Sequence, residues 1–225
     1  SSVNMLANQF STEILTVDIG IDSDIYCSNI INKKIAYGTR SIVKGPAMDP
    51  SQARKAISNG IEIVYDLCRN GTDIIITGEM GIGNTTTSAA IASLILGIPA
   101  EITTGRGAGL DSSGMSRKIA AIHRAIKLNK PEPTDPIDVL SKLGGFDIAG
   151  MTGLFLGGAE CGIPIVIDGV ISAVSACLAE MISPGCRDFM LPSHVSNEPS
   201  ARLLLEKLGL KAPINAGFHL GEGTG

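Results

Sequence analysis

The sequence is poor in the residue types that several large classes of protein need. Its 225 residues contain no Trp, 4% aromatic residues and three His. Lys and Arg number 18 against 22 Asp and Glu, which gives a formal net charge of −4, and the basic residues form no block. Proteins that bind nucleic acid need basic patches, often with aromatic side chains that stack on bases. We therefore expect no nucleic acid among the partners.

Long apolar runs and metal-binding patterns are also missing. The longest apolar runs, such as residues 163–167, are far below the roughly 18 residues that cross a bilayer, and the N-terminus has no signal-peptide pattern. We expect a cytoplasmic protein with no membrane partner. The cysteines form no C-x-x-C motif and no histidines stand at metal-ligand spacing, which predicts reduced thiols and no metal site. The five cysteines are Cys27, Cys68, Cys161, Cys177 and Cys186.

Small and aliphatic residues dominate what is present. Hydrophobic residues make up 44% of the chain and glycine occurs 27 times. Strand-like runs at residues 13–21, 73–83, 164–169 and 188–193 have continuous rather than alternating hydrophobicity, which indicates strands covered on both faces. Helical patterns begin after Asp49-Pro50, at Asn84-Thr85, after Gly169 and after Asn197-Glu198-Pro199. This alternation predicts an α/β fold with a Rossmann-like parallel sheet covered by helices on both faces.

The length fits one domain. At about 150 residues per domain the chain corresponds to one large domain or to one domain with a small appendage, and residues 1–225 show no internal repeat. The proline-rich stretch KPEPTDP at residues 130–136 predicts a surface loop. The chain opens inside a helical pattern and stops in a glycine-rich turn, so we expect residues 1–225 to be a single domain that is truncated at both ends.

The strongest local signal is TGEMGIGNTTTSAA at residues 77–90, where a strand runs into Gly78, Gly81 and Gly83 and then into a helix of small residues. Backbone amides at such a turn, with the helix dipole, form a cradle for an anion. Asn84 stands where a P-loop requires lysine, so the pattern favours a monophosphate over a triphosphate. A closely packed turn without a ligand is the alternative.

A second glycine cluster, TTGRGAGLDSSGMSRK, surrounds Arg106 with Gly105, Gly107 and Gly109 and leads to Lys118. Together with the first loop it could complete one phosphate site. The alternative is that both basic residues are ordinary solvated charges.

Carboxylates between glycines are the best candidates for general-base chemistry. Glu79 lies in the first glycine loop and Glu222 lies in GEGTG. Poorly solvated surroundings would raise the pKa of such a carboxyl and suit it to accepting a proton. For Glu79, bracing of the loop is an equal possibility. Asp18 and Asp168, at strand ends, either face the site or cap the turns that follow.

The segment PSHVSNEPS at residues 192–200 places His194, Ser196 and Glu198 at alternating positions. This spacing hints at a catalytic trio, but a hydrogen-bonded loop explains it equally simply, and there is no G-x-S-x-G motif.

Six motifs in order make the chain resemble the nicotinate-nucleotide:dimethylbenzimidazole phosphoribosyltransferases of cobalamin lower-ligand assembly. They are GEMGIGNTTTSAA, GRGAGLDSSGMSRK, GGFDIAGMTGLFLGGA, PIVIDGVISA, SHVSNEPSA and HLGEGTG. The resemblance implies transfer of the phosphoribosyl group of nicotinate mononucleotide to a benzimidazole-type base, with inversion at the anomeric carbon. It implies no metal and no organic cofactor, and a homodimer.

The resemblance also implies roles for single residues. Glu222 would be the general base that takes the proton of the incoming base, and Leu220 would line the pocket for that base. Glu79 would be a second active-site carboxylate in the substrate site. The remaining substrate-binding residues would hold the phosphate, the ribose or the nucleotide: Gly81, Gly83, Asn84, Thr85, Gly107, Lys118 and Ser196.

Two other functions stay open at this point. A non-catalytic nucleotide-binding or sensor module would use the same glycine loops without turnover. An ATP-dependent kinase is weakened by the missing P-loop lysine and by the lack of a clear pair of magnesium-binding carboxylates. Family members also have an N-terminal segment that forms part of the base pocket, so the acceptor base stays open as well.

Overall fold

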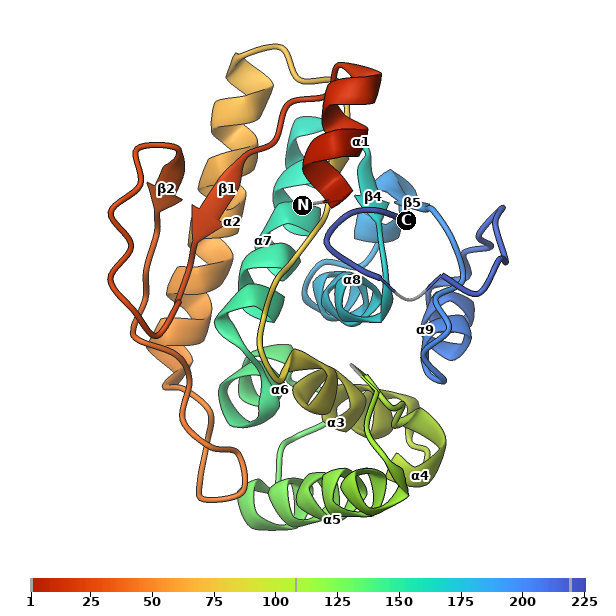
Figure 1. Ribbon diagram of the computed structural model, residues 1–225. Helices are drawn as coiled ribbons and strands as arrows, with labels where there is room; N and C mark the ends of the chain where they lie inside the picture. The colour runs from red at the N-terminus through yellow and green to blue at the C-terminus, as the bar shows by residue number, and fades with distance from the viewer. Residues whose placement is uncertain (1, 108, 219) are drawn as a thin grey trace.

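The computed structural model describes residues 2–107, 109–218 and 220–225 (Figure 1); His219 of the HLGEGTG motif lies outside them. Its α-helices and one 3-10 helix, η1, alternate with short strands. In chain order the elements are α1 (Ser2–Phe10), β1 (Thr16–Asp18), β2 (Ile30–Asn32), α2 (Pro50–Arg69), β3 (Ile75–Ile76), α3 (Asn84–Leu96), α4 (Ala100–Thr103), α5 (Ser112–Asn129), α6 (Pro136–Leu143), α7 (Phe146–Cys161), β4 (Ile165–Ile167), α8 (Val170–Ile182), η1 (Cys186–Phe189), β5 (Met190–Pro192) and α9 (Ala201–Leu208).

The central sheet is parallel, in the order β3-β4-β5. Ile75 pairs with Ile165, and Ile165 pairs with Met190 on its other side. Both α7 and α8 contact β4, whose Ile165 and Ile167 are buried. The α/β class with a parallel sheet flanked by helices is thus confirmed, and three of the four expected strands lie in this sheet, although each is only two or three residues long.

The fourth expected strand lies elsewhere. Within residues 13–21 the strand is β1, which pairs in parallel with β2 in a separate two-stranded sheet. Its burial runs from exposed Thr16 to buried Asp18, so it is not covered on both faces. The element that lies beside α7 is helix α2 and not β1 (Figure 1).

Helices α2 and α7 lie in unusually close contact because glycines form their interface. A Cβ atom on Gly60 would lie 2.1 Å from the carbonyl oxygen of Gly150, and one on Gly153 would lie 2.0 Å from that of Ile57. Since real Cβ atoms do not approach backbone atoms so closely, only glycine fits at these positions. The two helices therefore form one closely packed layer, of which α7 contacts β4.

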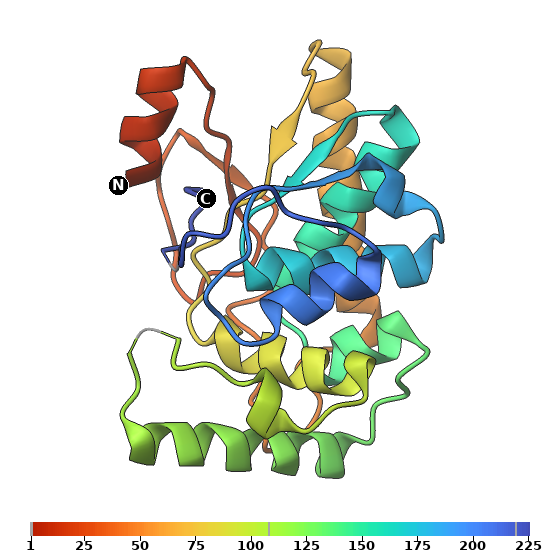
Figure 2. The same ribbon diagram turned by 90° about the vertical axis from the view of Figure 1, so that its right-hand side faces the viewer.

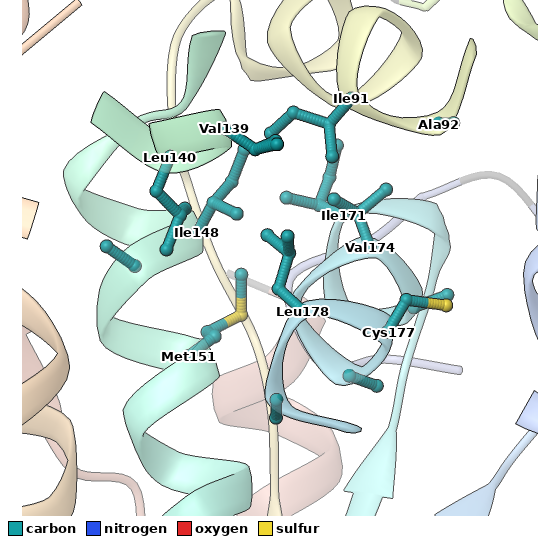
Figure 3. Packing of buried hydrophobic residues seen from close by; sticks show 14 of the residues in the cluster. Ile91, Ala92, Val139, Leu140, Ile148, Met151, Ile171, Val174, Cys177 and Leu178 are labelled. Carbon is teal, nitrogen blue, oxygen red and sulfur yellow. The ribbon is translucent and has the colours of Figure 1, made fainter. Parts of the chain in front are cut away.

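The main core lies where four helices meet. Figure 3 shows side chains of α3, α6, α7 and α8 pointing toward one another, among them Ile91, Leu140, Ile148 and Leu178, which are fully buried. Figure 2 shows α3 between α5 and the rest of the domain, and α3 contacts both α5 and α8. The proline-rich residues 130–136 connect α5 to α6, as expected for a loop, and the Asp135 side chain caps α6.

Candidate active site

The polar segments of the glycine motifs meet at the carboxyl ends of the three parallel strands. The first glycine loop follows β3, residues 168–169 follow β4, and residues 193–198 follow β5. Parallel strands end at the same edge of a sheet, where open α/β folds bind their ligands. The tail at residues 220–225 crosses this edge, since a Cβ atom on Gly78 would lie 3.0 Å from the backbone of Glu222 and of Gly223.

A cavity of about 220 Å³ opens between these segments. It brings together residues from all six motifs, including the first turn of α8. The residues that line it are Gly78, Glu79, Thr85, Gly107, Met151, Asp168, Gly169, Val170, Ile171, Ser172, His194, Ser196, Glu198, Leu220 and Gly221. Five of the site residues expected from the sequence are among them: Glu79, Thr85, Gly107, Ser196 and Leu220.

Glu79 is held in the cavity wall by two donors. Its Oε2 accepts a hydrogen bond from the backbone N–H of Gly81 at 2.9 Å and a short one from the side-chain amide of Asn84. The same Asn84 nitrogen donates to Asp147 Oδ2 at 2.8 Å. Burial raises the pKa of the Glu79 carboxyl, the two hydrogen bonds oppose this, and the charges of Asp147 and Asp168 raise it further. Glu79 is therefore both braced and shifted toward protonation.

Asn84 and Gly81 thus act behind the cavity surface. Asn84 is buried in the first turn of α3 and joins two carboxylates that are far apart in the sequence. Gly81 leaves no room for a side chain, because a Cβ atom there would lie 2.2 Å from Asp147 Oδ2. Gly83 precedes α3 with a φ of 79°, which favours glycine. None of the three lines the cavity.

Asp168 is the anchor of the C-terminal tail. Asp168 is buried, with 5% of its surface exposed. Its carboxylate accepts hydrogen bonds from the backbone N–H of Gly223 at 3.1 Å and from that of Gly225 at 2.8 Å. Its own N–H lies within 3.4 Å of Thr77 Oγ1, at the end of β3. Of the two alternatives for Asp168, the structure therefore supports a residue that faces the site.

Glu222 has a backbone conformation that is rare for its type. Its φ is 60°, between Gly221 at 79° and Gly223 at 75°. A non-glycine residue in the left-handed region costs about 1–2 kcal/mol, and such strain is concentrated at functional sites. Glu222 itself does not line the cavity, whereas its neighbour Gly221 does. A Cβ atom on Gly221 would lie 3.9 Å from Glu79 Oε1, so the two motifs that carry the candidate carboxylates are in contact.

Lys118 reaches the site from α5 as a buried lysine, 7% exposed. Its Nζ donates to Thr85 Oγ1 at 3.1 Å and to the carbonyl oxygen of Gly105 at 2.9 Å. Burial lowers the pKa of its ammonium group, and the negative charge of Glu198 opposes that shift. The glycine loops at residues 78–85 and 105–107 are thus joined through one cation, and the alternative of an ordinary solvated Lys118 is wrong.

The segment after β5 forms a hydrogen-bonded loop rather than a catalytic trio. His194 Nδ1 pairs with Ser193 Oγ at 2.9 Å, and its ring packs on Phe218 with centroids 5.3 Å apart. Ser196 Oγ accepts the N–H of Glu198 at 3.4 Å. The Glu198 side chain points to the second glycine loop, where its Oε1 accepts the N–H of Gly107 at 3.1 Å.

Sequence reasoning missed the partners that hold the site together. Asp147 received no role, although it follows two glycines at the start of α7, a place that suits a carboxylate. Arg106 is an exposed residue that donates a hydrogen bond to the carbonyl oxygen of Leu110 and does not line the cavity.

The described residues contain no group of three or more His, Cys, Asp or Glu side chains that could hold a metal ion. No helix in that part of the chain is long and apolar enough to span a bilayer.

Comparison with known proteins adds relatives over the whole chain. A family model described as Phosphoribosyltransferase matches residues 1–225. Two nicotinate-nucleotide-dimethylbenzimidazole phosphoribosyltransferases, from Ruminiclostridium cellulolyticum and Acetivibrio thermocellus, are 49% and 47% identical, each over 100% of this chain and 64% of the relative. The crystal structure of CobT from Thermus thermophilus matches with a TM-score of 0.94 at 34% identity, over 100% of this chain and 67% of that chain. The chain thus spans 64% of the length of these two curated relatives.

Proposed function

Because the chain belongs to the phosphoribosyltransferase family, we propose that the protein transfers the 5-phosphoribosyl group of nicotinate mononucleotide to 5,6-dimethylbenzimidazole. The products are α-ribazole 5′-phosphate and nicotinate, in the assembly of the nucleotide loop of cobalamin. The curated relatives carry this activity in their names. The substrates are therefore two small molecules, and the reaction needs no cofactor.

The observation that carries the proposal is the meeting of two kinds of group around one cavity. Thr85, Gly107 and Ser196 offer hydroxyl and backbone donors, with Lys118 directly behind Thr85. Glu79 lines the same cavity, and so do Leu220 and Gly221 of the tail that bears Glu222. A phosphate site next to carboxylates is what transfer of a phosphoribosyl group requires, because one end of the donor is anionic while its reacting carbon becomes cation-like.

The proposed roles follow from this arrangement. Gly107, Lys118, Thr85 and Ser196 bind the donor phosphate and ribose. Glu79, held by Gly81 and Asn84, stays close to the reacting centre, and Gly83 sets the start of α3 so that its first turn faces the donor. Leu220, which lines the cavity and is 61% exposed, contacts the incoming aromatic base.

Glu222 is the proposed general base. The acceptor nitrogen attacks C1′ of the ribose from the side opposite to nicotinate, and the bond between C1′ and the nicotinate nitrogen breaks. Glu222 takes the N–H proton that the benzimidazole ring loses from its other nitrogen as the new bond forms. The nicotinate ring keeps the bonding electrons and leaves as a neutral pyridine, so the configuration at C1′ inverts. Positioning of two bound reactants supplies a large part of such a rate enhancement.

We further propose that residues 1–225 form one nucleotide-binding catalytic domain of a cytoplasmic homodimer. Family resemblance supports the homodimer, and the composition supports the location. The benzimidazole is the expected acceptor, and adenine, other benzimidazoles and phenolic bases are the alternatives.

The test is a mass-spectrometric assay of the full-length protein with nicotinate mononucleotide and a panel of bases. Glu222→Gln should keep donor binding but lose rate by about 100-fold or more, the scale of general-base catalysis. Glu206→Gln, at an exposed position of α9, is the matched control and should keep full activity. Tight donor binding without product from any base would instead favour the non-catalytic nucleotide-binding module.

A further inference from the structure

The side chain of Glu198 occupies the second glycine loop. Its Oε1 accepts the N–H of Gly107, which has a φ of 54°. At Gly105 a Cβ atom would lie 1.9 Å from Glu198 Oε2, so the carboxylate rests directly on the backbone of this loop. The contact joins residues 91 positions apart. It places a negative charge on a backbone that a phosphate would otherwise use.

The same carboxylate lies among the groups proposed to bind phosphate. Thr85, Gly107, Ser196 and Glu198 all line the cavity. Lys118, the buried cation behind them, spends two of its three donors on Thr85 and on the Gly105 carbonyl. A Cβ atom on Gly107 would lie 3.6 Å from Lys118 Nζ. The Gly107 N–H that donates to Glu198 and the ammonium group of Lys118 therefore belong to one small site.

We propose that Glu198 is an internal anion that holds the phosphate-binding backbone of Gly107 while no nucleotide is bound, and that the substrate phosphate displaces it. This inference rests on the proposed function, which puts the phosphate at Gly107 and Lys118. The N–H of Gly107 has one proton to donate. A carboxylate and a phosphate on the same donor would be like charges a few ångströms apart in a poorly solvated cavity, which disfavours their coexistence.

The consequence is selection against small anions. Inorganic phosphate gains only the contacts of the cradle and must displace Glu198 with those alone. A nucleotide that also engages the ribose and base subsites has more binding energy with which to displace the carboxylate. Glu198 is therefore a specificity-determining residue that keeps free phosphate out and favours whole phosphoribosyl donors.

The experiment measures inorganic phosphate binding by titration calorimetry in the full-length protein, without any acceptor base. Glu198→Gln removes the charge but keeps an oxygen that accepts from Gly107. We expect its dissociation constant for phosphate to fall about tenfold or more, and the gain to shrink as salt is added. Glu206→Gln, on the helix that follows, should bind phosphate like the wild type. An unchanged or weaker phosphate affinity in Glu198→Gln would show that Glu198 only braces the loop.

A second variant covers a failure of the first to fold. Glu198→Asp keeps the charge but shortens the side chain, so it no longer reaches Gly107. Displacement predicts tighter phosphate binding in this variant, and a bracing role predicts weaker binding. The readout is independent of turnover: tighter phosphate binding without any riboside product would refute the transferase and keep the displacement. Product formation with unchanged phosphate affinity in Glu198→Gln would refute the displacement and keep the transferase.

Discussion

Asp168→Asn tests whether the C-terminal tail must be held for catalysis. The carboxylate of Asp168 accepts the N–H of Gly223 at 3.1 Å on one oxygen and that of Gly225 at 2.8 Å on the other. Both bonds lie directly C-terminal to the strained backbone of Glu222, whose φ is 60°. An asparagine keeps one acceptor oxygen and turns an NH₂ group toward the second N–H. The tail then loses one anchor and the charge that strengthens the other.

The size of the effect follows from the lost bond. A hydrogen bond to a charged group contributes about 1.5–3 kcal/mol to stability. Losing one such bond lowers the population of the anchored tail roughly 10- to 150-fold relative to the released tail. If Glu222 can accept the proton of the base only while the tail is anchored, kcat should fall by about 10-fold or more. The KM for nicotinate mononucleotide should change much less, because the proposed phosphate contacts lie on other loops.

The assay is steady-state production of riboside phosphate by the full-length protein, with hydrogen exchange at the tail amides as a second readout. Exchange at Gly223 and Gly225 should become faster in Asp168→Asn. The matched control is Asp188→Asn, whose side chain is 77% exposed in η1. A folded Asp168→Asn with wild-type kcat would refute the view that Asp168 positions the general base.

Two further predictions concern packing and protonation. Gly153→Ala would put a methyl group 2.0 Å from the carbonyl oxygen of Ile57; overpacking of about 1–3 kcal/mol or more outweighs the ~1 kcal/mol gain in helix propensity. The melting temperature of Gly153→Ala should fall by several degrees in calorimetry. The control Ser116→Ala, at an exposed position of α5, should leave the melting temperature unchanged. Glu79→Gln should raise the melting temperature at pH 8 but not at pH 4. The folded-state pKa of Glu79 is raised, so stability is lost as pH rises through it; an offset that is equal at both pH values would contradict this.

Local signals predicted much of the fold. Asp49 and Pro50 mark the start of α2, with a capping box between Asp49 and Gln52. Gly169 precedes α8, as expected from the sequence. Helix α7 was not predicted, because its glycines are typical of turns. They are needed for the close approach to α2, a tertiary contact that outweighs the poor helix propensity of glycine.

The site was predictable where function is encoded in one loop and not where it depends on contacts between loops. The glycines and Glu79 stand together in the sequence, so their proximity could be expected. The links from Asn84 to Asp147 and from Asp168 to Gly225 span 63 and 57 residues. No local pattern specifies such pairs, because any polar residue at a strand or helix end could meet several partners. Only the order of strands in the sheet selects among them.

The charges around the cavity favour a transferase over a module that only holds a nucleotide. Among the described residues that line it, Glu79, Asp168 and Glu198 are acidic, and none is Lys or Arg. The cation Lys118 lies behind Thr85, to which its Nζ donates. A storage site for an anionic nucleotide gains no affinity from such a lining. A site that must stabilise a ribosyl centre as it becomes cation-like gains most at the transition state, which is where an enzyme needs its strongest interactions.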